Sequence, residues 1–171
     1  GVKNMRTIRT KIYNFTELSE EAQQYAITKY YDINTDYNWW ENVYQDAENI
    51  ELNITSFDLE RKEITGKLYN GGLTTAKNII DNHGKDCDTY KLAEQFIKEF
   101  EEAEKLVREE DFYDYFYDRE KQFLKDVLNC YFKMLENELE YRESEEAITE
   151  TLSNAYEFLS DGTIYYSSKT I

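Results

Sequence analysis

Two long stretches of helical periodicity constrain the fold of this chain more than any other feature. Apolar residues recur every three or four positions from about Asp88 to Glu110, and again from Phe112 to Arg142. This spacing places apolar side chains along one face of an α-helix. The sequence therefore predicts two long amphipathic helices that pack as an antiparallel pair.

Further helices are expected where serine, threonine or aspartate precedes helical spacing, because these side chains cap helix N-termini. The helix over residues 74–82 should end at Gly84, since glycine readily adopts the left-handed conformation that closes a helix. The other predicted helices cover residues 20–30 behind Ser19, residues 36–50 behind Thr35 or Asp36, and residues 145–159 behind Ser144.

Strands are expected where apolar and polar residues alternate. Residues 7–13 alternate, residues 52–69 resemble a hairpin around a charged turn at 60–63, and residues 163–166 form a terminal strand after the Asp161-Gly162 turn. We predict an α+β fold, in which a small antiparallel sheet contains strand 7–13 beside the hairpin and is covered on one face by helices. A length of 171 residues fits a single domain, residues 1–171.

The chain is acidic, with a formal net charge of −16 that is concentrated in its second half. Charged residues interrupt every apolar run, so we expect no membrane segment, and the opening residues lack the apolar part of a signal peptide. These features predict a soluble protein that is not exported through a signal peptide. Cys87 and Cys130 belong to no CxxC or Cys/His cluster, and we expect no disulfide framework, metal or other cofactor.

Several residue groups could carry chemistry, each with a structural alternative. The single His83 could act as a general acid or base, or could simply complement a helix dipole. Asn70-Gly71-Gly72 could bind an anion at a helix N-terminus or form an ordinary turn. The carboxylates at positions 111, 114 and 118 share one helix face, where they could hold a divalent cation or form a solvated acidic surface. No GxSxG, HExxH, Walker or GxGxxG motif occurs.

The predicted sheet carries cations and phenol rings on its outer face. If the strands pair, this face gathers groups that engage phosphates and stack on bases, as single-stranded nucleic acid requires. A solvated sheet face is the alternative. The candidate nucleic-acid-binding residues are Arg9, Lys11, Arg61, Lys62 and Lys67, and Tyr13 and Tyr69 lie on the same strands.

Two blocks of sequence resemble a known group of proteins. They are TKIYNFTELSEEAQQYAITKYYDINTDYNWWENVYQDAENI at residues 10–50 and SEEAITETLSNAYEFLSDGTIY at residues 144–165. Both are similar to small acidic proteins of phages and plasmids of Firmicutes, some of which are anti-CRISPR proteins acting on type II-A Cas9. One branch of that group resembles inhibitors that truncate guide RNA.

The resemblance implies an anti-CRISPR protein that disables a Cas9 ribonucleoprotein by binding or truncating its guide RNA. The expected partners are the Cas9–guide RNA complex or the free guide RNA, and the expected location is the cytoplasm of the bacterial host. The oligomeric state stays open. Cleavage without a metal needs a proton donor, a proton acceptor and cations. His83 could exchange protons with Tyr13 or Tyr69, while Arg9, Lys11 and Lys67 stabilise charge.

Two other functions remain open at this stage. The acidic helices could mimic nucleic-acid phosphates and occupy the basic channel of Cas9 or of a restriction enzyme without catalysis. Alternatively, exposed tyrosines could serve a phage regulatory or scaffolding protein as anchors at protein interfaces.

Overall fold

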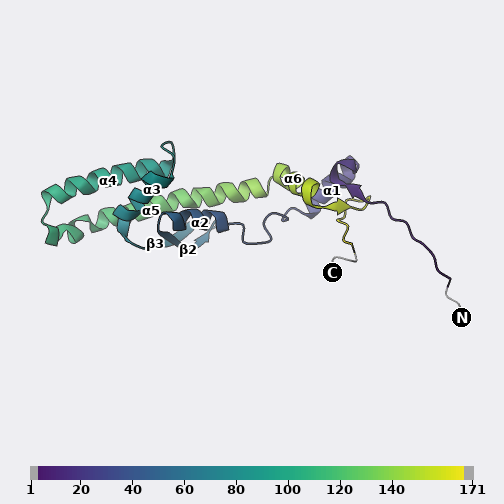
Figure 1. Cartoon of the computed structure of the whole chain (residues 1–171), viewed down its shortest axis with the longest axis horizontal. Helices are drawn as coiled ribbons and strands as arrows, with labels where there is room; N and C mark the ends of the chain where they lie inside the picture. Colours follow the sequence, from purple (N-terminus) through teal and green to yellow (C-terminus); the bar gives the residue numbers. More distant parts are fainter. Residues whose placement is uncertain (1–3, 168–171) are drawn as a thin grey trace. The chain divides into compact units, whose positions relative to one another are not determined.

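The structure, a computed structural model, describes residues 4–167, which form two compact units (Figure 1). The terminal unit combines residues up to Trp39 with those from Leu139 onward, and the central unit is Trp40–Glu138. The described part of the fold is α+β, with six α-helices and two small antiparallel sheets. The single domain over residues 1–171 stays a prediction, because compactness within each unit does not measure how the two are coupled.

The terminal unit is built from short elements near both ends of the described chain. Strand β1 (Tyr13–Asn14) pairs with β4 (Glu157–Phe158), the short 3-10 helix η1 (Phe15–Glu17) follows β1, and helices α1 (Glu20–Lys29) and α6 (Glu145–Ala155) complete the unit. Ser19 and Ser144 cap α1 and α6 as predicted, each hydroxyl accepting a backbone N–H bond of 3.2 Å. The core consists of Phe15, Leu18, Ala22, Ala26, Ile148, Leu152, Phe158 and Ile164.

The prediction of a strand over residues 7–13 is wrong. Residues 4–12 form no regular structure, and the side chain of Ile8 is 76 % exposed. Only Tyr13 belongs to a strand, and that strand pairs with β4 rather than with the hairpin. The physical reason is that alternation defines two faces but gives a strand no hydrogen-bonding neighbour. Phe15 and Leu18 instead supply the apolar side chains that this part of the chain buries.

The hairpin of the central unit is confirmed. Strands β2 (Leu52–Asp58) and β3 (Glu63–Leu68) pair in antiparallel register, with an irregularity between Ile54 and Ser56. One face presents Leu52 and Ile54 to the core, where helix α2 (Glu41–Asn49) contacts β2. The opposite face is polar, so helices cover the sheet on one face only, as predicted.

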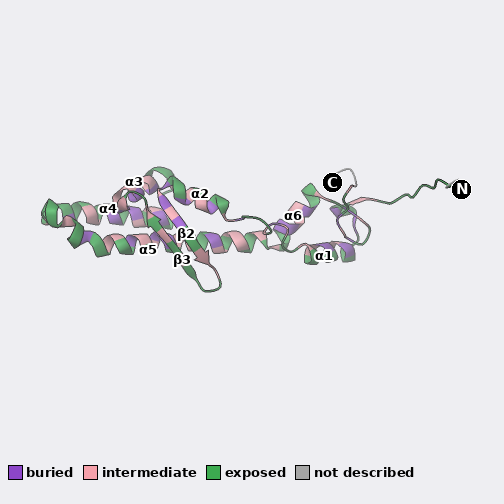
Figure 2. Ribbon diagram, turned by 90° about the horizontal axis from the view of Figure 1, so that it is seen from below, coloured by how far each residue is buried: buried purple, intermediate pink, exposed green. Residues whose placement is uncertain are grey.

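The long helices are also confirmed, with α4 at Asp88–Leu106 and α5 at Glu109–Arg142. They run side by side in opposite directions, and α3 (Gly71–Asn82) packs against α4 (Figure 1). Phe96 of α4 stacks on Phe123 of α5 with ring centroids 4.2 Å apart. Figure 2 shows the buried residues on the facing sides of these helices. Within residues 4–167, no helix is long and apolar enough to cross a membrane.

Several predicted boundaries need correction. Helix α2 begins at Glu41 rather than behind Thr35 or Asp36, because residues 30–35 form turns in which Thr35 bonds the carbonyl of Asp32. Gly84 is not left-handed: α3 ends in an extended His83, with φ −100° and ψ 150°. Helix α3 starts three residues earlier than predicted, and α6 ends at Ala155 rather than at residue 159. The terminal strand over residues 163–166 is reduced to one bridge between Ile164 and Phe158.

Candidate functional site

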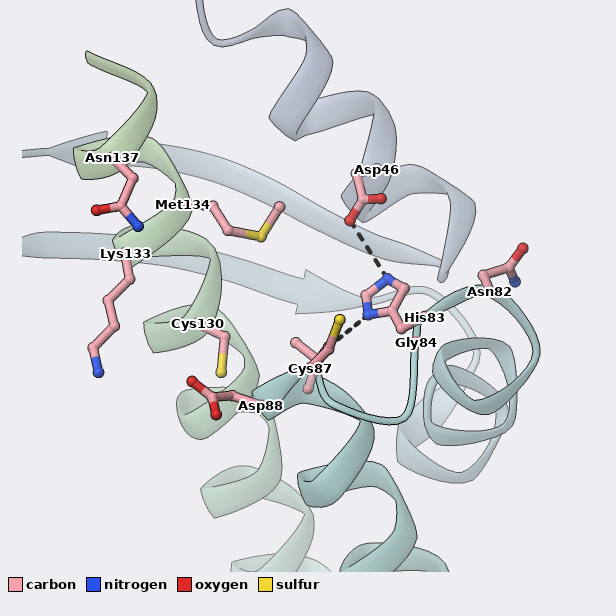
Figure 3. Close-up of a pocket in the computed structure, with 11 residues that line it drawn as sticks. Asp46, Asn82, His83, Gly84, Cys87, Asp88, Cys130, Lys133, Met134 and Asn137 are labelled. Atoms are coloured by element: carbon pink, nitrogen blue, oxygen red, sulfur yellow. Dashed lines mark hydrogen bonds and ion pairs between the residues drawn. The ribbon is translucent and has the colours of Figure 1, made fainter. Parts of the chain in front are cut away.

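His83 lies at the end of α3 and beside a pocket of the central unit (Figure 3). Its Nδ1 atom is 2.6 Å from the Thr89 hydroxyl, and its Nε2 atom is 3.5 Å from Oδ2 of Asp46. The His83 side chain is only 10 % exposed. Both ring nitrogens therefore face groups of the protein rather than open solvent.

Asp46 joins this network to helix α5. The buried Tyr131 hydroxyl donates a 2.6 Å hydrogen bond to Oδ2 of Asp46. Burial, together with the negative charge and hydrogen bonding of Asp46, raises the pKa of the Tyr131 phenol far above its usual range. Asp46, His83, Thr89 and Tyr131 come from four segments that this network holds together. Sequence reasoning found His83 but not its partners. Asp46 and Tyr131 are distant in the sequence, and Thr89, six positions after His83, belongs to no motif that links the two residues.

The pocket beside His83 has a volume of about 500 Å³ and contains both cysteines among its lining residues. Cys87 and Cys130 are free thiols. Burial, with the nearby Asp88 carboxylate, raises the pKa of the Cys130 thiol, so this residue stays protonated and weakly nucleophilic. Among residues 4–167, no three His, Cys, Asp or Glu side chains are grouped so that they could hold a metal ion.

The two tyrosines proposed to act with His83 lie in different surroundings. Tyr69 belongs to the central unit and donates a 3.1 Å hydrogen bond to Glu48, whereas His83 faces Asp46 and Thr89. Tyr13 belongs to β1 of the terminal unit. In the described structure, the hydrogen bonds of Tyr69 and His83 therefore do not join the two side chains into a proton-transfer pair.

The predicted basic sheet face does not form, because Arg9 and Lys11 lie in no strand, and β1 and β3 belong to separate sheets. Arg9 and Lys11 lie exposed in the segment before β1, whereas Lys67 is exposed on β3. Arg61 and Lys62 lie at the hairpin turn, where Arg61 pairs with Asp58 at 3.8 Å. The five predicted cations are therefore divided between the two units.

A smaller basic cluster does form beside the hairpin. Lys62 lines a hollow of about 320 Å³ together with Lys121 and Lys125 of α5. Glu63 lines the same hollow. Sequence reasoning missed Lys121 and Lys125, although their i, i+4 spacing on a long helix places both on one face.

The residues Asn70-Gly71-Gly72 form the start of α3, but a protein carboxylate already occupies that position. Glu120 of α5 accepts a 3.0 Å hydrogen bond from the Gly72 N–H. A helix N-terminus favours negative charge, and Glu120 supplies it. The alternative of an external anion site therefore gains no support here.

A dense cluster of exposed negative charge lies where α4 ends and α5 begins, in residues 101–118, which we call the acidic tip. It has only two basic side chains, Lys105 and Arg108, and therefore a net charge of −6. The three carboxylates predicted to share a helix face are among its members. Its eight exposed carboxylates are Glu101, Glu102, Glu104, Glu109, Glu110, Asp111, Asp114 and Asp118.

Exposed aromatic rings alternate with these carboxylates on α5. Tyr113 is 82 % exposed, and Tyr115 and Tyr117 are exposed by more than half. Beneath them, Phe112 stacks on Phe116 at 5.3 Å and meets Phe100 edge-on at 4.8 Å. The acidic tip thus combines dense negative charge with an aromatic surface.

Comparison with known proteins supplies no assignment for this site. No known protein family, curated protein or solved structure matches the chain.

Proposed function

We propose that this protein is a non-enzymatic inhibitor whose acidic tip occupies the basic, nucleic-acid-binding channel of another protein. The Cas9 ribonucleoprotein implied by the sequence resemblance is the first target to test. The observation that carries the proposal is the set of eight exposed carboxylates within residues 101–118. Charge of one sign on an exposed surface steers association with a surface of the opposite sign.

The geometry of α5 supports this function. Asp111, Asp114 and Asp118 are exposed and spaced at i, i+3 and i+7, so they lie on one helix face about 5–6 Å apart. A row of negative charges held by a helix needs no ordering when a partner binds, which reduces the entropic cost. Exposed tyrosines beside the row can supply contact area, because a phenol offers both an apolar face and a polar tip.

Catalysis gains less support from the same structure. A general base must reach the proton that it removes. His83 is nine-tenths buried and directs its ring nitrogens at Thr89 and Asp46. The network around His83 is better explained as a structural connection between helices than as a ribonuclease centre.

The experiment compares two charge variants as inhibitors of DNA cleavage by Cas9 loaded with guide RNA. The tip variant replaces Asp111, Asp114 and Asp118 with Asn. If each exposed charge contributes roughly 0.5 kcal/mol to the free energy of binding to the target, the three charges together contribute about 1.5 kcal/mol. The tip variant should therefore need about tenfold more protein for half-inhibition. Raising the salt concentration should weaken the wild type more than this variant.

The matched control removes the same charge from exposed carboxylates outside the tip, by Glu140→Gln, Glu143→Gln and Glu150→Gln. This control should inhibit as the wild type does. If the tip variant and the control lose inhibition equally, the net charge of the protein explains inhibition, and the acidic tip has no special role. Inhibition at catalytic rather than stoichiometric amounts of the wild type would exclude the non-enzymatic function.

A second candidate function, binding of guide RNA, is favoured by the cations at and beside the hairpin. Lys62, Lys121 and Lys125 could neutralise successive phosphates, and each such contact contributes a salt-dependent share of the affinity. Exchanging these three lysines for Glu should then abolish RNA binding in a gel-shift assay. Arg9→Glu with Lys11→Glu separately tests the exposed cations before β1, and a variant that still inhibits at the wild-type dose would exclude their involvement.

A further inference from the structure

Two adjoining hollows lie at the acidic tip and share Phe112 and Tyr113 as lining residues. One, with a volume of about 440 Å³, extends from the start of α3 to Phe100 and Glu120. The other, of about 380 Å³, lies toward Glu104 and Glu109. We call the two together the Phe112 groove.

The floor of the Phe112 groove is aromatic. Phe100, Phe112 and Phe116 contact one another with ring centroids 4.8–5.4 Å apart. Phe100 and Phe112 are only partly buried, and Tyr113 is almost fully exposed. Packing these rings against an apolar side chain would remove further apolar surface from water, which is favourable.

The charge around the groove selects the kind of partner. Glu104, Glu109 and Glu120 line it, whereas none of the described lining residues is lysine or arginine. The carboxylates that line the groove repel the phosphates of a nucleic acid or of an anionic lipid surface. They also disfavour a second copy of this chain, which has a net charge of −16.

We propose that the Phe112 groove binds an apolar side chain, such as Phe or Leu, from a basic peptide segment of the protein partner. Arginine or lysine residues flanking that side chain would face the carboxylates of the acidic tip. This inference rests on the proposed function, because it specifies what part of a basic protein the tip engages. The negative charge of the acidic tip attracts many basic surfaces, and the aromatic rings of the Phe112 groove favour those that carry an apolar side chain.

The test uses two fluorescent peptides and the full chain. One peptide has six arginines around a central Phe-Leu pair, and the other has Gly-Ser in place of that pair. Fluorescence anisotropy at physiological salt should give about tenfold tighter binding of the Phe-Leu peptide, a difference of about 1.4 kcal/mol. Tyr113→Ala should remove most of this preference, because Tyr113 lines both hollows.

Tyr115→Ala is the matched control. Tyr115 is exposed on the same helix two positions away but is not among the lining residues, so this variant should keep the preference. Both tyrosines are more than half exposed, so neither substitution should disturb folding, and circular dichroism checks this.

Each alternative outcome overturns the proposal in a distinguishable way. Equal affinities for the two peptides would exclude the groove while leaving the acidic tip as a binder of basic partners. Absence of binding by either peptide would overturn the proposed function as well. Equal effects of Tyr113→Ala and Tyr115→Ala would place the Phe-Leu pair elsewhere. A concentration-dependent dimer in sedimentation that Tyr113→Ala abolishes would identify a second copy as the occupant.

Discussion

Replacing Gly72 with alanine tests how closely the first turn of α3 packs against α4 and α5. A Cβ atom at this position would lie 2.7 Å from Cζ of Phe96 and 3.1 Å from Cγ of Glu120. Carbon atoms pack best at about 3.5–4.0 Å, so the contact with Phe96 would be roughly 0.8 Å too short. Phe96 is fully buried and stacked on Phe123, which leaves its ring little room to move.

Two opposing effects determine the change in the free energy of unfolding. Alanine is favoured over glycine within a helix by about 1 kcal/mol. An extra methyl group in a well-packed core costs about 1–3 kcal/mol, and the upper half of that range applies where the neighbour is held in place. We expect Gly72→Ala to lower the free energy of unfolding by about 1–2 kcal/mol. The melting temperature should fall by roughly 2–8 °C for a chain of this size.

Thermal unfolding followed by far-ultraviolet circular dichroism provides the assay, with Gly84→Ala as the control. A Cβ atom on the exposed Gly84 would lie 3.8 Å from Sγ of Cys87, an ordinary contact, so this variant should stay within about 0.5 kcal/mol of the wild type. A Gly72→Ala protein that melts at or above the wild-type temperature, beside an unchanged control, would refute the close packing of α3.

Three further perturbations follow from local geometry. Lys62 has a φ of 56°, so Lys62→Gly should relieve left-handed strain and raise the urea midpoint by an amount equivalent to about 0.5 kcal/mol, and a lower midpoint would contradict this. Ser144→Ala removes the cap of α6 and should lower the free energy of unfolding by about 1 kcal/mol, and hydrogen exchange should become faster in α6 but not in α4. Burial alone would raise the pKa of Glu99, but hydrogen bonds from Arg119 and Gln95 lower it overall. The stability that Glu99 contributes, under about 1 kcal/mol for a partly exposed pair, is thus present above pH 4.5 and lost as the pH falls through the folded-state pKa. Denaturation of Glu99→Gln and wild type across pH 3–7 should give curves that converge at low pH, and a constant difference would disprove the assignment.

Helix periodicity locates α4 and α5 well, because the apolar spacing of a helix can be recognised within one continuous stretch of sequence. The caps at Ser19 and Ser144 are predictable for the same reason, since each acts three residues along the chain. The β2–β3 hairpin is also local, because its strands are joined by a short turn.

The missed features depend on residues far apart in the sequence. Glu120, 48 positions away, accepts the Gly72 N–H at the start of α3, and Asp46 of α2 faces His83. The strand predicted over residues 7–13 failed because alternation identifies a possible strand but not its partner. The prediction of a basic sheet face required strand 7–13 to pair with the hairpin, and it is wrong for the same reason. The acidic face of α5 could be predicted from helical spacing alone.

The hydrogen bond between Glu120 and the Gly72 N–H makes one backbone amide a reporter of tertiary structure. Amides in the first turn of a helix have no partner within that helix and usually exchange rapidly with solvent. The Gly72 amide instead has a partner 48 residues away, on α5. Its exchange rate therefore measures how often α3 separates from α5, and a single resonance can follow the opening of the central unit as the protein binds a partner.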